Sequence, residues 1–187
     1  MLPLVVDLVG RRVVVLGAGR VSHQKVALLL AAGAKVTIIT EQVVVAVDDG
    51  VEAIVLRPYQ RGDLEGAFLV VSATGNERVN DLVVAEAREL NILLNVVDDA
   101  SRSNFFFTAV HRDGDVVVSV STEGSSPALA QWVRNAIAKA LPKNLADVAR
   151  RLRLERDAIH ARGESTENLA WMQRVEELVS ENDETSR

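Results

Sequence analysis

A short glycine-rich loop near the start of the chain restricts the possible folds more than any other feature. The apolar run from Val13 to Leu16 breaks into Gly17-Ala18-Gly19 and then enters a helical stretch, Lys25 to Ala32. This order predicts a strand, a tight turn and a helix, whose glycines let the backbone approach a pyrophosphate and whose N-terminus offers free N–H groups. A dinucleotide is the expected ligand, and the residues expected to hold it are Gly17, Gly19, Arg20 and Val21.

A second strand completes a βαβ unit. Gly33 follows the helix as a C′ glycine, and residues 35–40 form the next apolar run. Glu41 lies just past this strand, about twenty residues beyond the loop, where an acidic side chain commonly binds the adenosine ribose. Glu41 and the adjacent Gln42 are therefore candidate cofactor contacts. No arginine pair stands beside them to bind the 2′-phosphate of NADP, so NAD is favoured over NADP. Two alternatives stay open: a merely structural turn, since its third position is Ser22, and a solvated Glu41.

Alternating strand and helix patterns continue up to residue 99. Strands are predicted over residues 51–56, 68–73 and 93–97, with a long helix over 76–90. This alternation predicts an α/β, Rossmann-like parallel sheet whose ligands gather at the carboxyl ends of the strands. Thr74 follows the fourth strand and is a candidate cofactor contact, while Asp98 follows the fifth. An aspartate after a strand also caps turns, and spacing alone favours that role for Asp98.

The remaining chain has a different pattern. Extended runs at 105–110 and 116–121 flank the turn sequence Arg112-Asp113-Gly114-Asp115, which predicts a β-hairpin. Ser126 and Pro127 begin a helix that runs to about Leu141, and two helices follow at 145–160 and 166–180, the second capped by Thr166. The expected domains are an NAD-binding domain over 1–110, a hairpin and dimerisation region over 111–145 and a C-terminal helical segment over 146–187.

Composition excludes several classes of protein. The 187 residues, 48% of them hydrophobic, are enough to bury a core, and the absence of cysteine excludes disulfides and thiolate chemistry. A net charge of −5 and an aromatic content of 4% argue against nucleic acid as the main partner. The first residues have neither a basic region nor an apolar run that would suit a signal peptide or membrane span, so a cytoplasmic protein is expected.

Four motifs in order resemble the precorrin-2 dehydrogenases of siroheme synthesis, which also form the N-terminal part of multifunctional siroheme synthases. The motifs are VVVLGAGRVSHQKVALLLAAGAKVTIIT at 13–40, SATGNERVN at 72–80, NVVDD at 95–99 and VSVSTEGSSPALA at 118–130. The resemblance covers nearly the whole chain. It implies a homodimer that oxidises precorrin-2 to sirohydrochlorin with NAD, and Asp98 matches the family's functional aspartate.

The resemblance also suggests where the tetrapyrrole binds. A loop that opens a helix and arginines near the hairpin suit its carboxylates, and the candidate contacts are Thr122, Ser125, Arg112 and Arg134, with Arg102 as a further cation. A basic patch over 131–156 either steers this substrate or is a solvated helix face; its members are Arg134, Lys139, Lys143, Arg150, Arg151, Arg153 and Arg156. Glu123 stands where the family usually has glycine, and Thr108 where it often has proline.

Other features leave alternatives open. Some members of the family also insert ferrous iron, but His23, His111 and His160 show no ligand spacing, so no metal ligands are assigned. An apolar helical stripe needs either a second copy of the chain or packing within the monomer; it comprises Leu129, Trp132, Val133, Ile137 and Leu141. The competing functional hypothesis is a non-catalytic module that senses NAD or NADH, in which Asp98 would have no chemical role.

Overall fold

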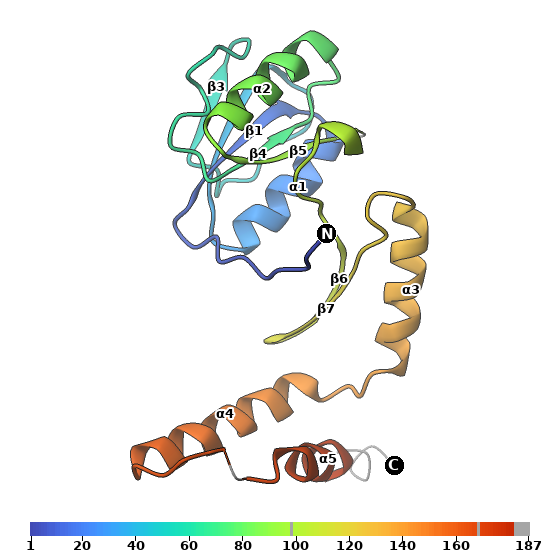
Figure 1. Ribbon diagram of the computed structural model, residues 1–187. Helices are drawn as coiled ribbons and strands as arrows, with labels where there is room; N and C mark the ends of the chain where they lie inside the picture. Colours follow the sequence, from blue (N-terminus) through green and yellow to red (C-terminus); the bar gives the residue numbers. More distant parts are fainter. Residues whose placement is uncertain (98, 168, 182–187) are drawn as a thin grey trace. The chain divides into compact units, whose positions relative to one another are not determined.

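The computed structural model describes residues 1–97, 99–167 and 169–181 (Figure 1). The chain divides into two compact units, Met1–Phe106 and Phe107–Arg187, and each is considered by itself. None of the helices within these described ranges combines the length and apolar character that crossing a membrane requires.

The first unit contains a five-stranded parallel sheet in the order β3-β2-β1-β4-β5. Its strands are β1 (Arg12–Ala18), β2 (Lys35–Val43), β3 (Ala53–Leu56), β4 (Leu69–Ser72) and β5 (Leu93–Val96). Its helices are α1 (Arg20–Ala31), α2 (Glu77–Glu89) and a short 3₁₀ helix, η1 (Ala100–Arg102). The predicted α/β class is therefore confirmed, although α1 begins at Arg20 rather than Lys25, because Gly19 alone separates β1 from the helix.

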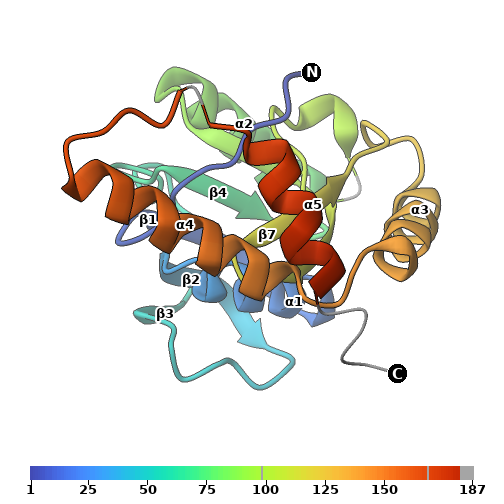
Figure 2. The same cartoon turned by 90° about the horizontal axis from the view of Figure 1, so that it is seen from below.

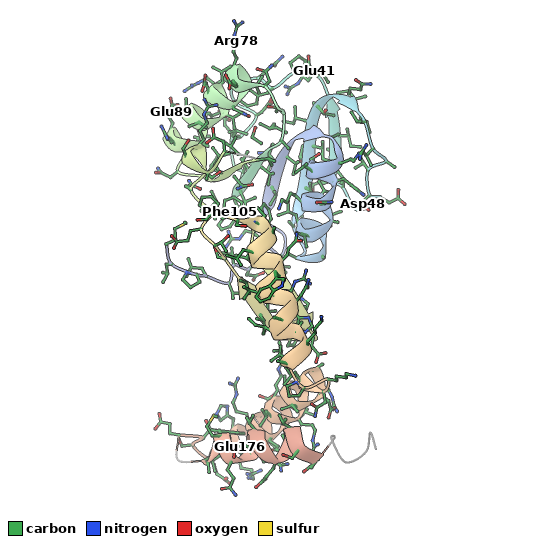
Figure 3. The ribbon with its side chains drawn as sticks, turned by 90° about the vertical axis from the view of Figure 1, so that its right-hand side faces the viewer. Glu41, Asp48, Arg78, Glu89, Phe105 and Glu176 are labelled. Atoms are coloured by element: carbon green, nitrogen blue, oxygen red, sulfur yellow. The ribbon has the colours of Figure 1, made fainter. Side chains whose placement is uncertain are left out.

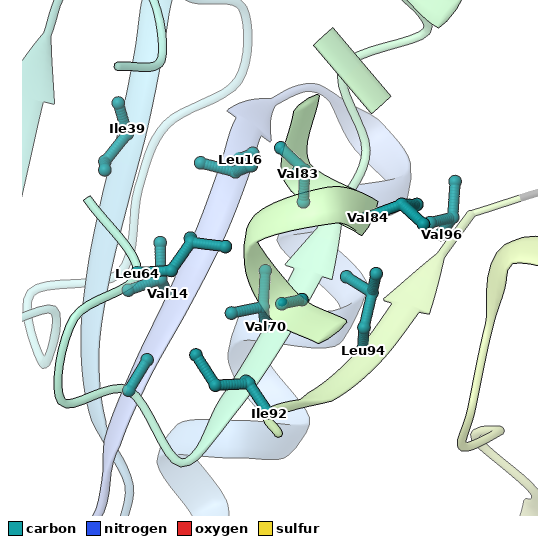
Figure 4. Packing of buried hydrophobic residues seen from close by; sticks show 12 residues of the cluster. Val14, Leu16, Ile39, Leu64, Val70, Val83, Val84, Ile92, Leu94 and Val96 are labelled. Carbon is teal, nitrogen blue, oxygen red and sulfur yellow. The ribbon is translucent and has the colours of Figure 1, made fainter. Parts of the chain in front are cut away.

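Helices α1 and α2 cover opposite faces of the sheet (Figure 2). The α2 face carries a cluster of twelve buried apolar residues (Figure 4): Val14, Leu16, Ile39, Leu64, Ala67, Val70, Val83, Val84, Ala87, Ile92, Leu94 and Val96. Alternate residues of β1, Val13 and Val15, are fully buried as well. Both faces of the central strand are thus packed, as expected for a parallel sheet between two helical layers.

A buried carboxylate fixes the connection between β3 and β4. Glu86 of α2 is only 3% exposed, and its carboxylate accepts hydrogen bonds from the backbone N–H groups of Gly62 and Leu64 and from the Tyr59 hydroxyl. Burial, with this hydrogen bond, raises the pKa of Tyr59. Three donors thus satisfy the buried carboxylate, which holds the loop against α2.

Two side chains protect the free edge of β5. The Asn104 side chain accepts a hydrogen bond from Leu94 N at 2.7 Å and donates one to Ile92 O at 3.0 Å, while the Ser103 hydroxyl accepts one from Val96 N at 2.9 Å. These bonds replace those of a neighbouring strand. The edge is therefore closed to pairing with another chain, and the turn after β5 is held in place.

The second unit consists of a hairpin and three helices. The hairpin pairs β6 (Ala109–Asp113) with β7 (Val116–Val120), and the helices are α3 (Pro127–Ala140), α4 (Leu145–Ala161) and α5 (Trp171–Glu181). The predicted hairpin and α3 are confirmed, with the Ser126 hydroxyl accepting a hydrogen bond from Leu129 N. The expected cap at Thr166 is wrong: α5 begins at Trp171, whose indole N–H instead donates to Thr166 O.

The hairpin turn anchors α4. The Asp113 carboxylate accepts a hydrogen bond from Ala146 N at 3.1 Å and so caps the N-terminus of α4. Gly114, with φ of +56°, lies so close that a Cβ on it would be 2.8 Å from the Ala146 Cβ. Hairpin and helix are therefore fixed to each other by a cap and a close backbone approach.

Candidate functional site

The candidate cofactor site lies where the order of the sheet reverses. The chain runs outward from β1 to β3 and then returns to place β4 on the other side of β1, so β1 and β4 border the switch point at which α/β sheets bind ligands. Gly17, with φ of +95°, ends β1 there, and a Cβ on it would be 2.6 Å from Ala73 O and 3.5 Å from Thr74 N. Only glycine fits between these two strand ends.

The N-terminus of α1 faces this turn without a side-chain cap. Gly19 is the N-cap residue, and the first helical hydrogen bond runs from His23 N to Gly19 O. The N–H groups of Arg20, Val21 and Ser22 come before this bond and have no carbonyl acceptor within the helix. They can therefore bind an anion. Space around Gly19 is open, because a Cβ there would meet nothing within 4 Å. Loop and helix end together form a cradle suited to a pyrophosphate.

A serine replaces the third glycine of the loop without opening it. Ser22 is 1% exposed, and its hydroxyl donates to Gly19 O at 2.8 Å. The small side chain therefore fits under the helix while its polar atom is satisfied within the turn. The departure from the usual glycine pattern leaves the cradle intact.

Glu41 and Gln42 lie at the carboxyl end of β2 with exposed side chains. Figure 3 labels Glu41. The buried Thr40 holds the backbone here, since its hydroxyl donates to Gln42 O at 2.8 Å. Val44 N then donates to Ala18 O, which ties this end of β2 to the end of β1. The structure thus brings the predicted ribose contact to the same edge of the sheet as the glycine loop.

Thr74 occupies the end of β4 and is oriented by a residue that the sequence did not single out. Asn80 of α2 is 9% exposed, and its Oδ1 accepts hydrogen bonds from the Ser72 hydroxyl at 2.7 Å and the Thr74 hydroxyl at 3.1 Å. Thr74 Oγ1 also accepts from Asn76 N at 3.2 Å. Because the Thr74 proton is already donated, this hydroxyl can offer a ligand only an acceptor.

The segment that follows β2 packs closely on α1. Residues 45–48 and the first turns of α1 enclose a hollow of about 10 Å³, room for roughly one water molecule. Its rim brings His23 Nδ1 within 4.0 Å of Asp48 Oδ2. The segment after β2 and the first turns of α1 therefore share a small hollow beside the glycine loop.

The end of β5 carries the predicted functional aspartate, Asp98, which lies outside the described residues. Its neighbour Asp99 caps η1, accepting hydrogen bonds from the Ser101 hydroxyl and from the N–H groups of Ser101 and Arg102. These bonds, chiefly the Ser101 hydroxyl, lower the pKa of Asp99. Arg102 in turn pairs with Asp99 at 3.1 Å and with Asp81 of α2 at 3.3 Å. Its charge is thus compensated by two carboxylates before any substrate is considered.

In the second unit, the loop before α3 is organised by its own hydroxyls. Thr122 Oγ1 accepts from Ser126 N at 3.1 Å and donates to Ser126 O at 3.0 Å, so this predicted substrate contact is engaged within the loop. The exposed Ser125 hydroxyl has no hydrogen-bond partner among the described residues. Glu123 adopts φ of +51°, the left-handed conformation that glycine adopts without strain.

The predicted cations of this unit differ in how far they are neutralised. Arg112 is exposed on the hairpin, and Arg134 of α3 has a buried Nε atom with no hydrogen-bond partner among the described residues. In the basic patch, three arginines form ion pairs: Arg150 with Asp147, Arg151 with Glu181 and Arg153 with Asp115. The field of the patch is therefore weaker than its sequence suggests.

Within the described ranges, no three His, Cys, Asp or Glu side chains lie close enough to hold a metal ion. Besides His23, His160 Nε2 lies 3.4 Å from the Thr166 hydroxyl, and His111 lies within β6 opposite Val118. The three histidines therefore have different neighbours, on different elements.

Fold and loop together define a dinucleotide-binding α/β domain, and comparison with known proteins agrees. A family model described as "Putative NAD(P)-binding" matches residues 4–109, and the chain belongs to this family. A second model, described as "Sirohaem biosynthesis protein central", matches residues 113–140.

Related proteins extend the similarity across both units. The chain is 35% identical over 154 residues to a siroheme synthase of Photorhabdus laumondii, which covers 80% of this chain and 33% of that protein. It is 36% identical over 146 residues to siroheme synthase 2 of Aeromonas salmonicida, covering 77% of this chain and 30% of that one. The chain thus spans about a third of the length of these relatives, and the resemblance seen in the sequence is confirmed.

A solved structure supports the same fold. The chain matches SirC, a precorrin-2 dehydrogenase, with a TM-score of 0.69 and 23% identity over 97% of this chain and 88% of that one. At this identity the likeness establishes the architecture, a parallel sheet followed by a hairpin and helices, and the prediction of that architecture is confirmed.

Proposed function

We propose that this protein is an NAD-dependent dehydrogenase that oxidises precorrin-2 to sirohydrochlorin in siroheme biosynthesis. The single observation that best supports this is the cradle at the switch point, where Gly17 fits against Ala73 in a chain of an NAD(P)-binding family. Similarity to siroheme synthases supports the choice of substrate class. The match covers only about a third of the length of these relatives, so the proposal concerns only the activity of the part that the chain matches.

The residues of the cradle would hold the cofactor in distinct ways. The N–H groups of the first turn of α1 bind the pyrophosphate beside Gly17 and Gly19, and the Arg20 guanidinium, which has no partner within the described ranges, adds a positive charge. Glu41 and Gln42 bind the adenosine ribose, and the carboxylate repels the 2′-phosphate of NADP. Thr74 accepts a hydrogen bond from the nicotinamide end.

The oxidation removes two hydrogens from the tetrapyrrole, one as hydride and one as a proton. When bound, NAD supplies the hydride acceptor. The protein orients the ring carbon, excludes water and takes up the proton, for which we propose the Asp98 carboxylate. Thr122, Ser125, Arg112 and Arg134 are proposed contacts for the acetate and propionate side chains.

Anaerobic turnover with enzymatically prepared precorrin-2 and NAD tests this proposal. The wild-type protein is expected to form NADH and sirohydrochlorin together, and Asp98→Asn is expected to lose most turnover while still binding NAD. The matched control is Asp99→Asn, which alters the neighbouring carboxylate that already caps η1. NAD binding without turnover in the wild type would refute the enzyme and favour the NAD(H)-sensing module.

We also infer a homodimer. Val133, Ile137 and Leu141 of the apolar stripe are half-buried within the second unit, whereas Leu129 and Trp132 are 51% and 69% exposed. A second copy is the partner that would cover these two side chains. Sedimentation equilibrium should give a dimer for the wild type and a monomer for Trp132→Asp; a monomeric wild type at micromolar concentration would refute it.

We further infer that the protein acts in the cytoplasm, as the sequence predicts. Fractionation of cells that express the tagged chain tests this location, and recovery with membranes or periplasm would contradict it.

A further inference from the structure

A groove between α4 and α5 lies outside the candidate cofactor site and shares no residue with the substrate contacts proposed above. It has a volume of about 480 Å³, within the usual range for small-molecule sites. Its lining residues are Ala149, Leu152, Arg153, Arg156, Trp171 and Val175. Those of α4 recur at intervals of three and four residues and those of α5 at an interval of four, so each helix contributes one face.

The apolar part of the groove is rigidly built. Trp171, which is half-buried, has its indole N–H bound to Thr166 O at 3.0 Å, so its ring orientation is fixed. Arg174 of α5 pairs with Glu155 of α4 at 2.6 Å, which joins the two helices, and each helix also has a buried apolar residue, Val148 and Leu178. A fixed aromatic ring between two braced helices suits a flat apolar ligand.

The charge at the groove is positive. Arg153 pairs with Asp115 at 2.6 Å, and both side chains are more than 60% exposed, so this pair is readily rearranged. Arg156 has no partner among the described residues, although it lies on a helix where Arg150 and Arg151 are both paired. No carboxylate belongs to the lining, so an anion would meet a full positive charge beside an aromatic ring.

We propose that the α4–α5 groove binds the body and one or more carboxylates of a polycarboxylated tetrapyrrole. This ligand class combines the flat apolar ring that Trp171 suits with the negative charges that Arg156 and Arg153 complement. The proposal rests on the proposed function for its choice of ligand and assigns the groove a role in holding the substrate or product.

Direct binding of uroporphyrin, a stable tetrapyrrole with carboxylates on every side chain, tests the groove without any reaction or cofactor. The chain has two tryptophans, so a Trp132→Phe background leaves Trp171 as the only one to report binding. Saturable quenching of its fluorescence is expected. Adding Arg156→Gln should weaken the affinity about tenfold, as for loss of a charge-assisted hydrogen bond.

Arg150→Gln is the matched control, because Arg150 lies on the same helix but pairs with Asp147 and does not line the groove. It should bind uroporphyrin as the parent does. Absence of saturable quenching, or equal losses for the Arg150 and Arg156 variants, would overturn the proposal. Binding that depends on Arg156 in a protein that fails to oxidise precorrin-2 would refute the dehydrogenase alone; turnover with no effect of Arg156 on binding would refute the groove alone.

Discussion

The carbonyl oxygen of Ala73 lies 2.6 Å from the point where a Cβ on Gly17 would stand. This contact joins the ends of β1 and β4, which border the switch point of the sheet. Any side chain at position 17 would have to push against backbone, and the φ of +95° adds strain for every residue except glycine. A substitution at position 17 should therefore affect both NAD binding at the cradle and the stability of the fold.

Gly17→Ala should lower the free energy of unfolding by about 2 kcal/mol and abolish NAD binding, because the strand ends must separate. Gly19→Ala is the matched comparison, since its Cβ would meet nothing within 4 Å and its φ is −94°. It should unfold as the wild type does yet bind NAD more weakly, as the added methyl fills the space above the cradle. Urea unfolding and calorimetric titration measure both effects; wild-type NAD affinity in both variants would contradict the site.

Glu41→Gln should weaken NAD binding about tenfold and narrow the preference over NADP, because the variant loses a charged acceptor and its repulsion of a 2′-phosphate. Glu52→Gln serves as control, as Glu52 precedes β3 and lies at the opposite, amino edge of the sheet. Affinities for both cofactors are measured for both variants. An unchanged ratio in Glu41→Gln would show that this carboxylate is merely solvated.

Two substitutions of Glu123 distinguish the effect of its backbone conformation from the effect of its charge. Glu123→Gly should raise the free energy of unfolding by about 0.5–1 kcal/mol, since glycine adopts φ of +51° without steric cost. Glu123→Gln keeps the strain and should not stabilise the protein. Both variants should lower KM for precorrin-2 about threefold at low salt, because each removes a carboxylate near a polyanion. A KM unchanged in both would place Glu123 away from the substrate.

An ion pair in the loop between β3 and β4 should make the free energy of unfolding decrease at acidic pH. Arg57 donates two hydrogen bonds to Asp63, at 2.8 and 2.6 Å, and these lower the pKa of that carboxyl. A lowered folded pKa gives stability that is complete above the unfolded pKa, near 3.9, and is lost as pH falls through the folded pKa.

Asp63→Asn should therefore cost about 1.5–3 kcal/mol at pH 7 and flatten the loss of stability as the pH falls below about 5. Urea unfolding across this range measures the slope. Glu89→Gln, which breaks the exposed pair with Arg61, should cost less than about 0.5 kcal/mol and leave the slope unchanged. Equal effects of the two substitutions would contradict the role given to Asp63.

Local patterns in the sequence predicted most of the fold. Glycine at positions 17 and 33, with φ of +95° and +77°, marked the turns on either side of α1, and buried apolar runs marked the strands. Ser126, predicted as a cap, marked the start of α3, and the helix predicted from residue 76 begins at Glu77 with Asn76 as its cap. These features depend on neighbouring residues, so they can be read without the fold.

Interactions between distant residues could not be predicted in this way. Asp113 caps α4 through Ala146, 33 residues away, and Glu86 holds Leu64, 22 residues away. Asn80 lay within a quoted motif, yet only the folded sheet shows that it orients Thr74. The start of α5 was misplaced because Thr166 has the chemistry of a cap, whereas the indole of Trp171 binds its carbonyl.

The most direct test of the account is the stoichiometry of one anaerobic reaction, in which absorbance of NADH and of sirohydrochlorin is recorded together in a mixture of the wild-type protein, precorrin-2 and NAD. The account predicts equal amounts of the two products, rising together, with NADP a much poorer substitute for NAD. Sirohydrochlorin formed without NADH, or no turnover by a protein that binds NAD, would contradict it.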